Sequence, residues 1–268
     1  LQYVAPSFNA SKQSGSDGAD HIDPATLRGL GPDQTLVLIN GKRRHQSSLI
    51  NVFGTRGRGN TGTDLNAIPV AAIKRIEVLR DGAAAQYGSD AITGVINIVL
   101  NDQTEEFQGN VTYGLYSTAA QGTFDPGTPN ADGKNRLYDK DRALDGQTVR
   151  ISGNYGIKLS QNGGFINMTT ELLSKQRTLR PGADFRKGFG EAAIDGFNFM
   201  LNAAVPLTQK TEAYAFGGRN FRDTDAYAFT RNNPTERNVL SIYPDGFTPR
   251  ITSNITDASV SAGIRHEM

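Results

Sequence analysis

Residues 73–100, IKRIEVLRDGAAAQYGSDAITGVINIVL, constrain the fold most. Aliphatic and β-branched residues concentrate in 73–79 and again in 95–100, and each run has the length of a strand. A turn at 80–82 separates the first run from 83–86, a helix-forming segment of only about one turn. Because so short a helix cannot cover two strands, the sequence predicts a compact strand, helix and strand unit that must pack against other parts of the chain.

Composition excludes several classes of protein. The 268 residues are 37% hydrophobic and include 30 glycines, which is typical of a turn-rich β protein. No apolar run reaches the length of about 18 residues that a transmembrane helix needs. The net charge of +1 gives no indication of a nucleic-acid partner. Since there are 0 cysteines, disulfides, thiolate nucleophiles and cysteine metal sites are excluded.

From about residue 105, apolar side chains recur at every second position, which predicts strands with one apolar and one polar face. Six such segments follow one another, and polar residues alternate with their apolar members. The fifth segment shows the weakest contrast, because alanines lie between its aromatic residues. The apolar members are Phe107, Val111, Tyr113 and Leu115; Val149, Ile151, Tyr155, Ile157 and Leu159; Ile166, Met168 and Leu172; Phe199, Leu201, Ala203, Val205 and Leu207; Tyr214 and Phe216; and Ala258, Val260, Ala262 and Ile264.

The connections between these segments alternate in length. Long polar loops near 117–145, 175–196 and 222–255 alternate with short turns at 160–164 and 206–210. An outer-membrane barrel has this arrangement, with short turns on the periplasmic rim and long loops outside. A soluble sandwich has no reason to place every long loop at one end. Because a closed barrel needs at least about eight strands, and an open edge is not tolerated in lipid, we expect the chain to be part of a longer one.

Three N-terminal segments invite a ligand-binding interpretation, but each has a simpler one. The acidic residues and His21 within 17–23 match no calcium loop, so we expect a solvated loop and no metal. The basic run 42–45 follows the hairpin dipeptide Asn40-Gly41 and lacks interleaved aromatic residues, which predicts a solvated turn. The loop 54–63, GTRGRGNTGT, lacks the lysine and the strand–helix context of a phosphate-binding loop.

No catalytic constellation is recognisable. His21, His45 and His266 lie in three separate segments, and none has a serine or carboxylate at a triad spacing. The zinc-protease and nucleophile-elbow motifs are also missing. We therefore expect a protein that is not an enzyme and needs no cofactor.

Two segments carry a family resemblance. Residues 73–100 closely resemble the end of the plug domain of TonB-dependent outer-membrane receptors, whose pattern there is roughly IERIEVLRGxxAxYGxxAxGGVINI. Residues 27–45, LRGLGPDQTLVLINGKRRH, resemble the earlier plug signature, an RGL turn followed by a strand and an NG turn. The resemblance implies a plug domain over 1–102, N-terminally truncated and without a recognisable TonB box. It also implies that 103–268 form the first six or so strands of a plugged barrel of about 22 strands.

The resemblance implies a function as well. Such a receptor lies in the outer membrane, binds a scarce nutrient outside and imports it when the TonB–ExbB–ExbD complex moves the plug. The implied partners are outer-membrane lipid, a small nutrient ligand and, in some receptors, a surface lipoprotein or another envelope subunit, but no nucleic acid. The ligand stays open among siderophore, cobalamin, oligosaccharide and peptide. The alternative is a non-transporting β-rich adhesin or a structural subunit of an envelope complex.

The resemblance also assigns roles to residues. Arginines in matching contexts pair with glutamates of the barrel wall and lock the plug, which implies this role for Arg28 and Arg80. At Arg80 the sequence departs from the pattern, because Asp81 replaces the usual glycine and is itself a candidate partner for Arg80. Candidate ligand contacts lie in the plug loops 42–48 and 54–63, together with the long external loops. In the plug loops these candidates are Arg43, Arg44, His45, Arg56, Arg58 and Asn60.

Overall fold

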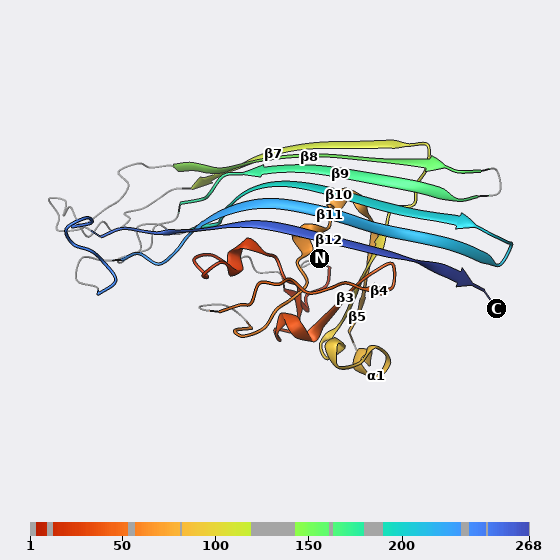
Figure 1. Cartoon of the computed structure of the whole chain (residues 1–268), viewed down its shortest axis with the longest axis horizontal. Coiled ribbons are helices and arrows are strands. Elements are labelled where there is room, and N and C mark those ends of the chain that lie inside the picture. Colours follow the sequence, from red (N-terminus) through yellow and green to blue (C-terminus); the bar gives the residue numbers. More distant parts are fainter. Residues whose placement is uncertain are drawn as a thin grey trace.

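The computed structural model describes residues 4–9, 13–52, 57–80, 82–118, 143–160, 163–179, 190–231, 236–244 and 246–267. A six-stranded antiparallel sheet, here called the wall, runs the length of the molecule (Figure 1). The N-terminal part of the chain up to residue 101, here called the inner domain, packs against one face of this wall. No helix among the described residues is both long and apolar enough to cross a membrane.

The wall consists of the six segments that the alternation predicts. In sheet order it is β12-β11-β10-β9-β8-β7, so each strand pairs with its neighbour in sequence. The longest strands have 17 residues, more than the about 9–11 that cross a bilayer. The strands are β7 (Phe107–Thr118), β8 (Ala143–Lys158), β9 (Phe165–Lys175), β10 (Ala193–Pro206), β11 (Thr211–Tyr227) and β12 (Arg250–His266).

Two of the long connections between wall strands are shorter than expected, because the strands extend past the residues with alternating apolar side chains. The β11–β12 connection covers residues 228–249 instead of 222–255, because pairing continues from Arg222↔Ile255 to Tyr227↔Arg250. An ion pair of 2.9 Å between Arg250 and Asp225 supports this polar extension. The β9–β10 connection similarly covers 176–192. Residues 119–142, most of the expected loop 117–145, lie outside the described residues.

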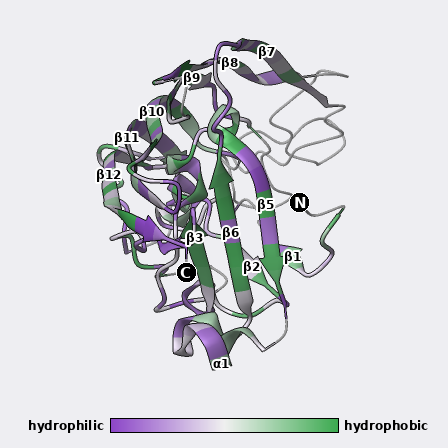
Figure 2. Cartoon of the chain, turned by 90° about the vertical axis from the view of Figure 1, so that its right-hand side faces the viewer, coloured by the Kyte–Doolittle hydropathy of each residue, from purple (hydrophilic) through white to green (hydrophobic). Residues whose placement is uncertain are grey.

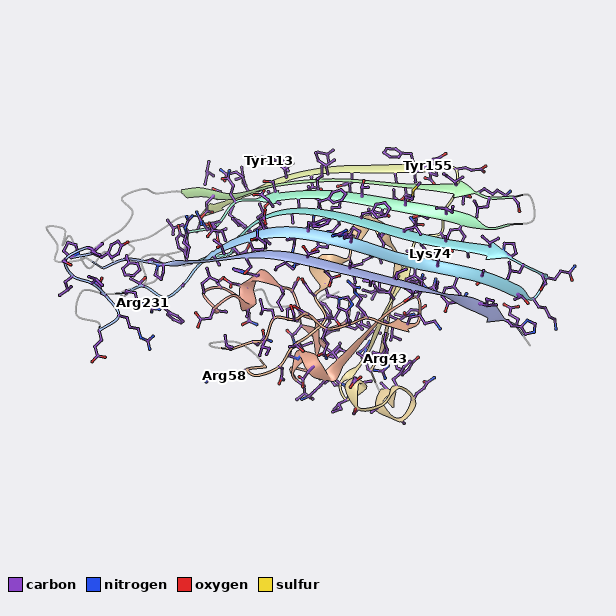
Figure 3. The ribbon with its side chains drawn as sticks, viewed as in Figure 1. Arg43, Arg58, Lys74, Tyr113, Tyr155 and Arg231 are labelled. Carbon is purple, nitrogen blue, oxygen red and sulfur yellow. The ribbon has the colours of Figure 1, made fainter. Side chains whose placement is uncertain are left out.

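The two faces of the wall have inverted polarity compared with a soluble sheet. The face toward the inner domain is polar and buried, and Asn154 and Asn220 are each only 1% exposed. The opposite face is apolar and open, and Val260 is 83% exposed. Tyr113 and Tyr155 project from this open face, away from the inner domain (Figure 3). Only an apolar solvent or a covering partner makes such an arrangement favourable.

The inner domain is built on a four-stranded sheet in the order β4-β3-β6-β5. β3 (Thr35–Ile39) runs parallel to β6 (Gly94–Leu100), while β5 (Ile73–Leu79) and β4 (Lys42–Arg43) pair antiparallel at the edges. The predicted unit over 73–100 is confirmed as β5, α1 (Ala83–Tyr87) and β6. Asn40 and Gly41 join β3 to β4 with φ of 48° and 77°, the two positive angles of a type I′ turn.

Both faces of β3 and β6 are covered, which makes these strands the core of the inner domain. On one side Leu36, Leu38 and Val95 pack against α1 and the following 3₁₀ turn. On the other side Met200 and Phe216 of the wall join the core. Figure 2 shows β6 as a hydrophobic strand beside the partly hydrophilic β5. The wall therefore completes the core that residues 73–100 could not close by themselves.

Short elements connect these parts. β1 (Phe8–Asn9) pairs with β2 (Thr26–Leu27), and the described loops contain five 3₁₀ turns. Asp64 caps one of these turns by accepting a hydrogen bond of 3.1 Å from the backbone N–H of Asn66. The 3₁₀ turns are η1 (Ala19–His21), η2 (Pro32–Gln34), η3 (Leu65–Ala67), η4 (Val70–Ala72) and η5 (Ser89–Ala91).

Candidate functional site

Asparagines of the wall form the seat of the inner domain. Asn202 donates from Nδ2 to the backbone oxygen of Asn101 at 3.0 Å and accepts at Oδ1 from Nδ2 of Asn40 at 3.1 Å. Asn101 donates in turn to Oδ1 of Asn154 at 3.2 Å. On the same strand as Asn202, Asn198 donates to the backbone oxygen of Asn66 at 3.3 Å. Asn154, Asn198 and Asn202 occupy inward positions of their wall strands. The alternation of the wall therefore places a row of amides under the inner domain.

A buried ion pair joins the inner domain to β11. Arg222 donates from Nη2 to Oδ2 of Asp64, and the two side chains are 2% and 4% exposed. Asp64 is held from its other side, because Oδ1 accepts from the backbone N–H of Asp23 at 3.1 Å. This pair was not predicted from the sequence, since Arg222 falls at the start of the expected loop 222–255.

A second cluster joins the inner domain to β12. Arg44 donates from Nη2 to Oδ1 of Asp257, and Nε2 of His45 lies 2.8 Å from the other oxygen of the same carboxylate. The Arg44 side chain is almost fully buried, whereas that of His45 is about half exposed. Two residues predicted as ligand contacts thus bind the wall in this structure.

The remaining candidate ligand contacts lie apart from this cluster. Arg43 forms an ion pair of 2.5 Å with Asp90 and donates to the backbone oxygen of Tyr87, which ties β4 to α1 and η5. Asn60 donates to Oδ1 of Asp33 at 2.5 Å. Arg58 lies exposed on the inner domain (Figure 3). Arg56 lies outside the described residues.

Arg28 and Arg80 are both exposed on the inner domain. Arg28 has a φ of 57°, and its backbone N–H donates to Ser7 at 2.7 Å. Asp81, the alternative partner of Arg80, lies outside the described residues. The locking role of both arginines stays a prediction.

His21 is the buried titratable group at the contact with β12. Its ring is 0% exposed, and Nδ1 lies 2.8 Å from Oγ of Ser253. Burial lowers the pKa of His21 below its ordinary value of 6.5, and Arg222 acts in the same direction, while Asp20 and Asp225 oppose the shift. Burial also raises the pKa of the Asp20 carboxyl, partly offset by His21. Among the described residues, no group of three or more His, Asp or Glu side chains could hold a metal ion.

The low pKa of His21 predicts a pH dependence of the seat. The folded state favours the neutral ring, so its contribution to stability is fully present above pH 6.5 and is lost as the pH falls through the lower pKa of the folded state. Between about pH 7.5 and about pH 5.5, we expect the free energy of unfolding to decrease less in His21→Asn than in the wild type. Chemical unfolding of the full-length protein at both pH values measures this difference. An identical pH slope in both proteins would contradict the prediction.

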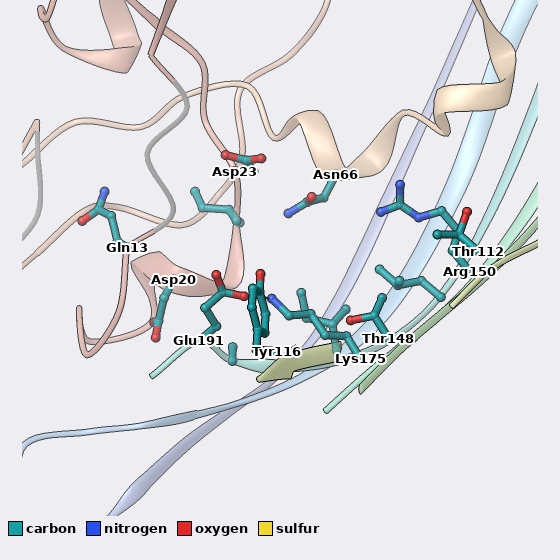
Figure 4. A pocket seen from close by; sticks show the side chains of 14 residues that line it. Gln13, Asp20, Asp23, Asn66, Thr112, Tyr116, Thr148, Arg150, Lys175 and Glu191 are labelled. Carbon is teal, nitrogen blue, oxygen red and sulfur yellow. Dashed lines mark hydrogen bonds and ion pairs between the residues drawn. The ribbon is translucent and has the colours of Figure 1, made fainter. Parts of the chain in front are cut away.

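Two adjoining cavities lie between the inner domain and the wall. One has a volume of about 310 Å³, and Figure 4 shows Asp20, Asp23 and Asn66 of the inner domain facing Arg150 and Lys175 of the wall across it. The other, of about 270 Å³, extends beneath the apolar side of β5 and β6 toward Arg222. Asp23, Asn66 and Arg150 line both cavities. The contact between the inner domain and the wall therefore includes open space that is lined by charged and amide groups.

Comparison with known proteins identifies the inner domain. Residues 1–95 match the family model described as the TonB-dependent Receptor Plug Domain. The inner domain is a TonB-dependent receptor plug. Over 107 residues the chain is 37% identical to the ferric enterobactin receptor PirA of Pseudomonas aeruginosa, and this match covers 40% of the chain and 14% of that protein. Over 105 residues it is 37% identical to the ferrienterobactin receptor of Escherichia coli K12, covering 39% of the chain and 14% of that protein.

The likeness of the fold extends from the plug into the wall. A mutant form of the ferric enterobactin receptor PfeA of Pseudomonas aeruginosa superposes with a TM-score of 0.58 and 20% identity. The superposition covers 100% of this chain and 36% of that one. The predicted fold, a plug followed by antiparallel strands of a plugged β-barrel, is therefore confirmed. The chain spans about a third of the length of this receptor.

Proposed function

We propose that this chain provides the plug and the first wall strands of a TonB-dependent receptor in the outer membrane, which binds a scarce nutrient outside the cell and passes it to the periplasm. The observation that carries the proposal is the inverted polarity of the wall: its apolar face is open and its polar face holds the plug. In an outer-membrane barrel the apolar face contacts lipid and the polar face contacts the plug in the lumen, so both faces have a favourable environment. Residues 1–102 act as the plug and 103–268 as wall.

The proposal requires further wall strands beside β7 and β12. Each of these strands has a neighbour on only one side within the described part of the chain. Unpaired backbone N–H and C=O groups are not tolerated in hydrocarbon, so the sheet must close on itself with additional strands. A closed barrel then surrounds the plug on all sides.

The relatives support a ferric siderophore as the nutrient, because the two curated proteins described above are named as receptors for ferric enterobactin. In this proposal the TonB–ExbB–ExbD complex supplies the energy that moves the plug, and a surface lipoprotein or another envelope subunit is a further candidate partner. The chain has no catalytic step to perform, since transport needs only binding and displacement of the plug.

Uptake of radiolabelled ferric enterobactin tests the proposed function. The full-length receptor is expressed in cells that lack their own siderophore receptors, with and without a functional TonB. We expect uptake that requires both the receptor and TonB. Uptake that persists without TonB, or a receptor that does not fractionate with the outer membrane, would contradict the proposal.

A charge on the open face of the wall tests its exposure to lipid. We expect Val260→Lys to reduce the stability of the full-length receptor folded into lipid vesicles by about 2–4 kcal/mol, because the ammonium group is forced into hydrocarbon. The matched control is Ser259→Lys, at the adjacent half-buried position on the lumen side, which should change stability far less. Urea titration measures both variants. The opposite ranking would mean that a protein surface, and not lipid, covers the apolar face.

A further inference from the structure

Arg222 uses only part of its hydrogen-bonding capacity. Nη2 binds Asp64, while Nε and Nη1 are buried and have no hydrogen-bond partner among the described residues. A guanidinium group has five N–H donors, and leaving donors unpaired in a buried place is costly. Arg222 is also one of the residues that line the 270 Å³ cavity between the plug and the wall.

Glu171 of β9 offers an unused acceptor in the same cavity. Oε1 accepts a hydrogen bond of 3.3 Å from Asn198, but Oε2 has no hydrogen-bond partner among the described residues. The closest cation is Arg150, whose Nε lies 3.8 Å from Oε2, beyond hydrogen-bond distance. Glu171 is 5% exposed, so this carboxylate is buried with incomplete compensation of its charge.

Gly196 on the intervening strand β10 opens the route from Arg222 to Glu171. Arg222 pairs directly with Gly196, which pairs in turn with Leu173 on β9, two residues from Glu171. A Cβ atom at Gly196 would lie 3.1 Å from Cγ and 3.8 Å from Cδ of Arg222, so the arginine side chain lies over this glycine. A larger residue there would block the side chain from lying across β10.

From this arrangement we propose that Arg222 exchanges partners: it holds Asp64 while the plug is seated and turns across Gly196 to Glu171 when the plug leaves the wall. The inference rests on the proposed function in that it requires a plug that moves. The exchange keeps the arginine paired in both states and gives Glu171 a hydrogen-bonded cation, where the seated state offers only Arg150 at 3.8 Å. It therefore reduces the cost of separating the buried Arg222–Asp64 pair.

Hydrogen exchange in the full-length receptor tests the exchange of partners without any ligand. The amides of β6 report how often the plug opens, because this strand is the plug core. Asp64→Asn weakens the seated state, so we expect faster exchange of these amides. Glu171→Gln removes the partner of the open state, so we expect exchange slower than in the wild type, by about tenfold to 150-fold for one charged hydrogen bond. In an Arg222→Met background, Glu171→Gln should have no effect.

The sign of the Glu171→Gln effect decides together with the Arg222→Met background, because relief of a buried charge alone would slow exchange in both backgrounds. If Glu171 only stabilises the seated wall, the substitution accelerates exchange of β6; if Glu171 has no role, the rate does not change. Either result overturns the proposal. Arg150→Gln serves as the control, because it removes the nearest present cation of Glu171 and leaves Arg222 in place. If the wild-type receptor shows no TonB-dependent uptake, that result would count against the proposed function, whatever the exchange rates show.

Discussion

Replacing Arg222 with methionine is expected to weaken the seating of the plug by about 3–5 kcal/mol, because the change leaves the Asp64 carboxylate buried without its counter-ion. Both side chains are almost fully buried, so bulk solvent screens the unpaired charge only weakly. Chemical unfolding of the plug in the full-length receptor measures the effect. The double variant Asp64→Asn with Arg222→Met should recover much of the loss, since no charge then remains buried.

Arg265→Met provides the matched control for this experiment. Arg265 pairs with Glu212 at 2.6 Å, but its side chain is 57% exposed. Exposed pairs contribute only about 0–1 kcal/mol, so the same chemical change should have little effect here. An Arg222→Met receptor as stable as Arg265→Met would show that the Asp64 pair does not hold the plug.

The second large loss of stability is expected where the linker between the plug and β7 crosses strand β8. Gly156→Ala should destabilise the receptor by about 3 kcal/mol, at the upper end of overpacking effects, because the close neighbour is backbone and cannot turn aside. A Cβ atom at Gly156 would lie 1.7 Å from the backbone oxygen of Gln103, on the linker between the plug and β7. The linker is held there by a hydrogen bond of 2.7 Å from the Glu105 N–H to the Gly156 oxygen.

Gly114→Ala on β7 is the control for Gly156→Ala. A Cβ atom at Gly114 would meet no atom within 4 Å, so the substitution should be tolerated. Urea denaturation of the two receptors in vesicles gives the comparison. Equal midpoints for both variants would mean that the linker can move away from β8 at little cost.

The sequence predicted the wall well where packing follows an alternating pattern. It placed all six strands, because each has an apolar lipid-type face and a polar one. It failed at the ends of β11 and β12, where residues 222–227 and 250–255 pair through polar side chains that resemble a loop. It was also wrong about Tyr214 and Phe216, which it counted with the apolar face of the wall but which point inward and pack on the plug core. An aromatic residue fits either face when the lumen contains an apolar domain.

The seat of the plug was much harder to predict than its fold. Asp64 and Arg222 are 158 positions apart, and no local pattern marks two such residues as a pair. Arg44 and His45 were recognised as a basic run, but their partner Asp257 appears in the sequence only as one polar residue of a strand. The resemblance directed attention to Arg28 and Arg80, whose locking role remains a prediction that concerns other wall strands.

The row of asparagines under the plug has a consequence for acid conditions. An amide neither gains nor loses a proton in the range that living cells meet, so the hydrogen bonds of Asn154, Asn198 and Asn202 keep their strength as the medium outside the cell turns acidic. Water can replace either partner of an amide without leaving a bare charge behind. The response of the seat to moderate acid therefore depends on the buried His21 and the neighbouring Asp20, at its contact with β12.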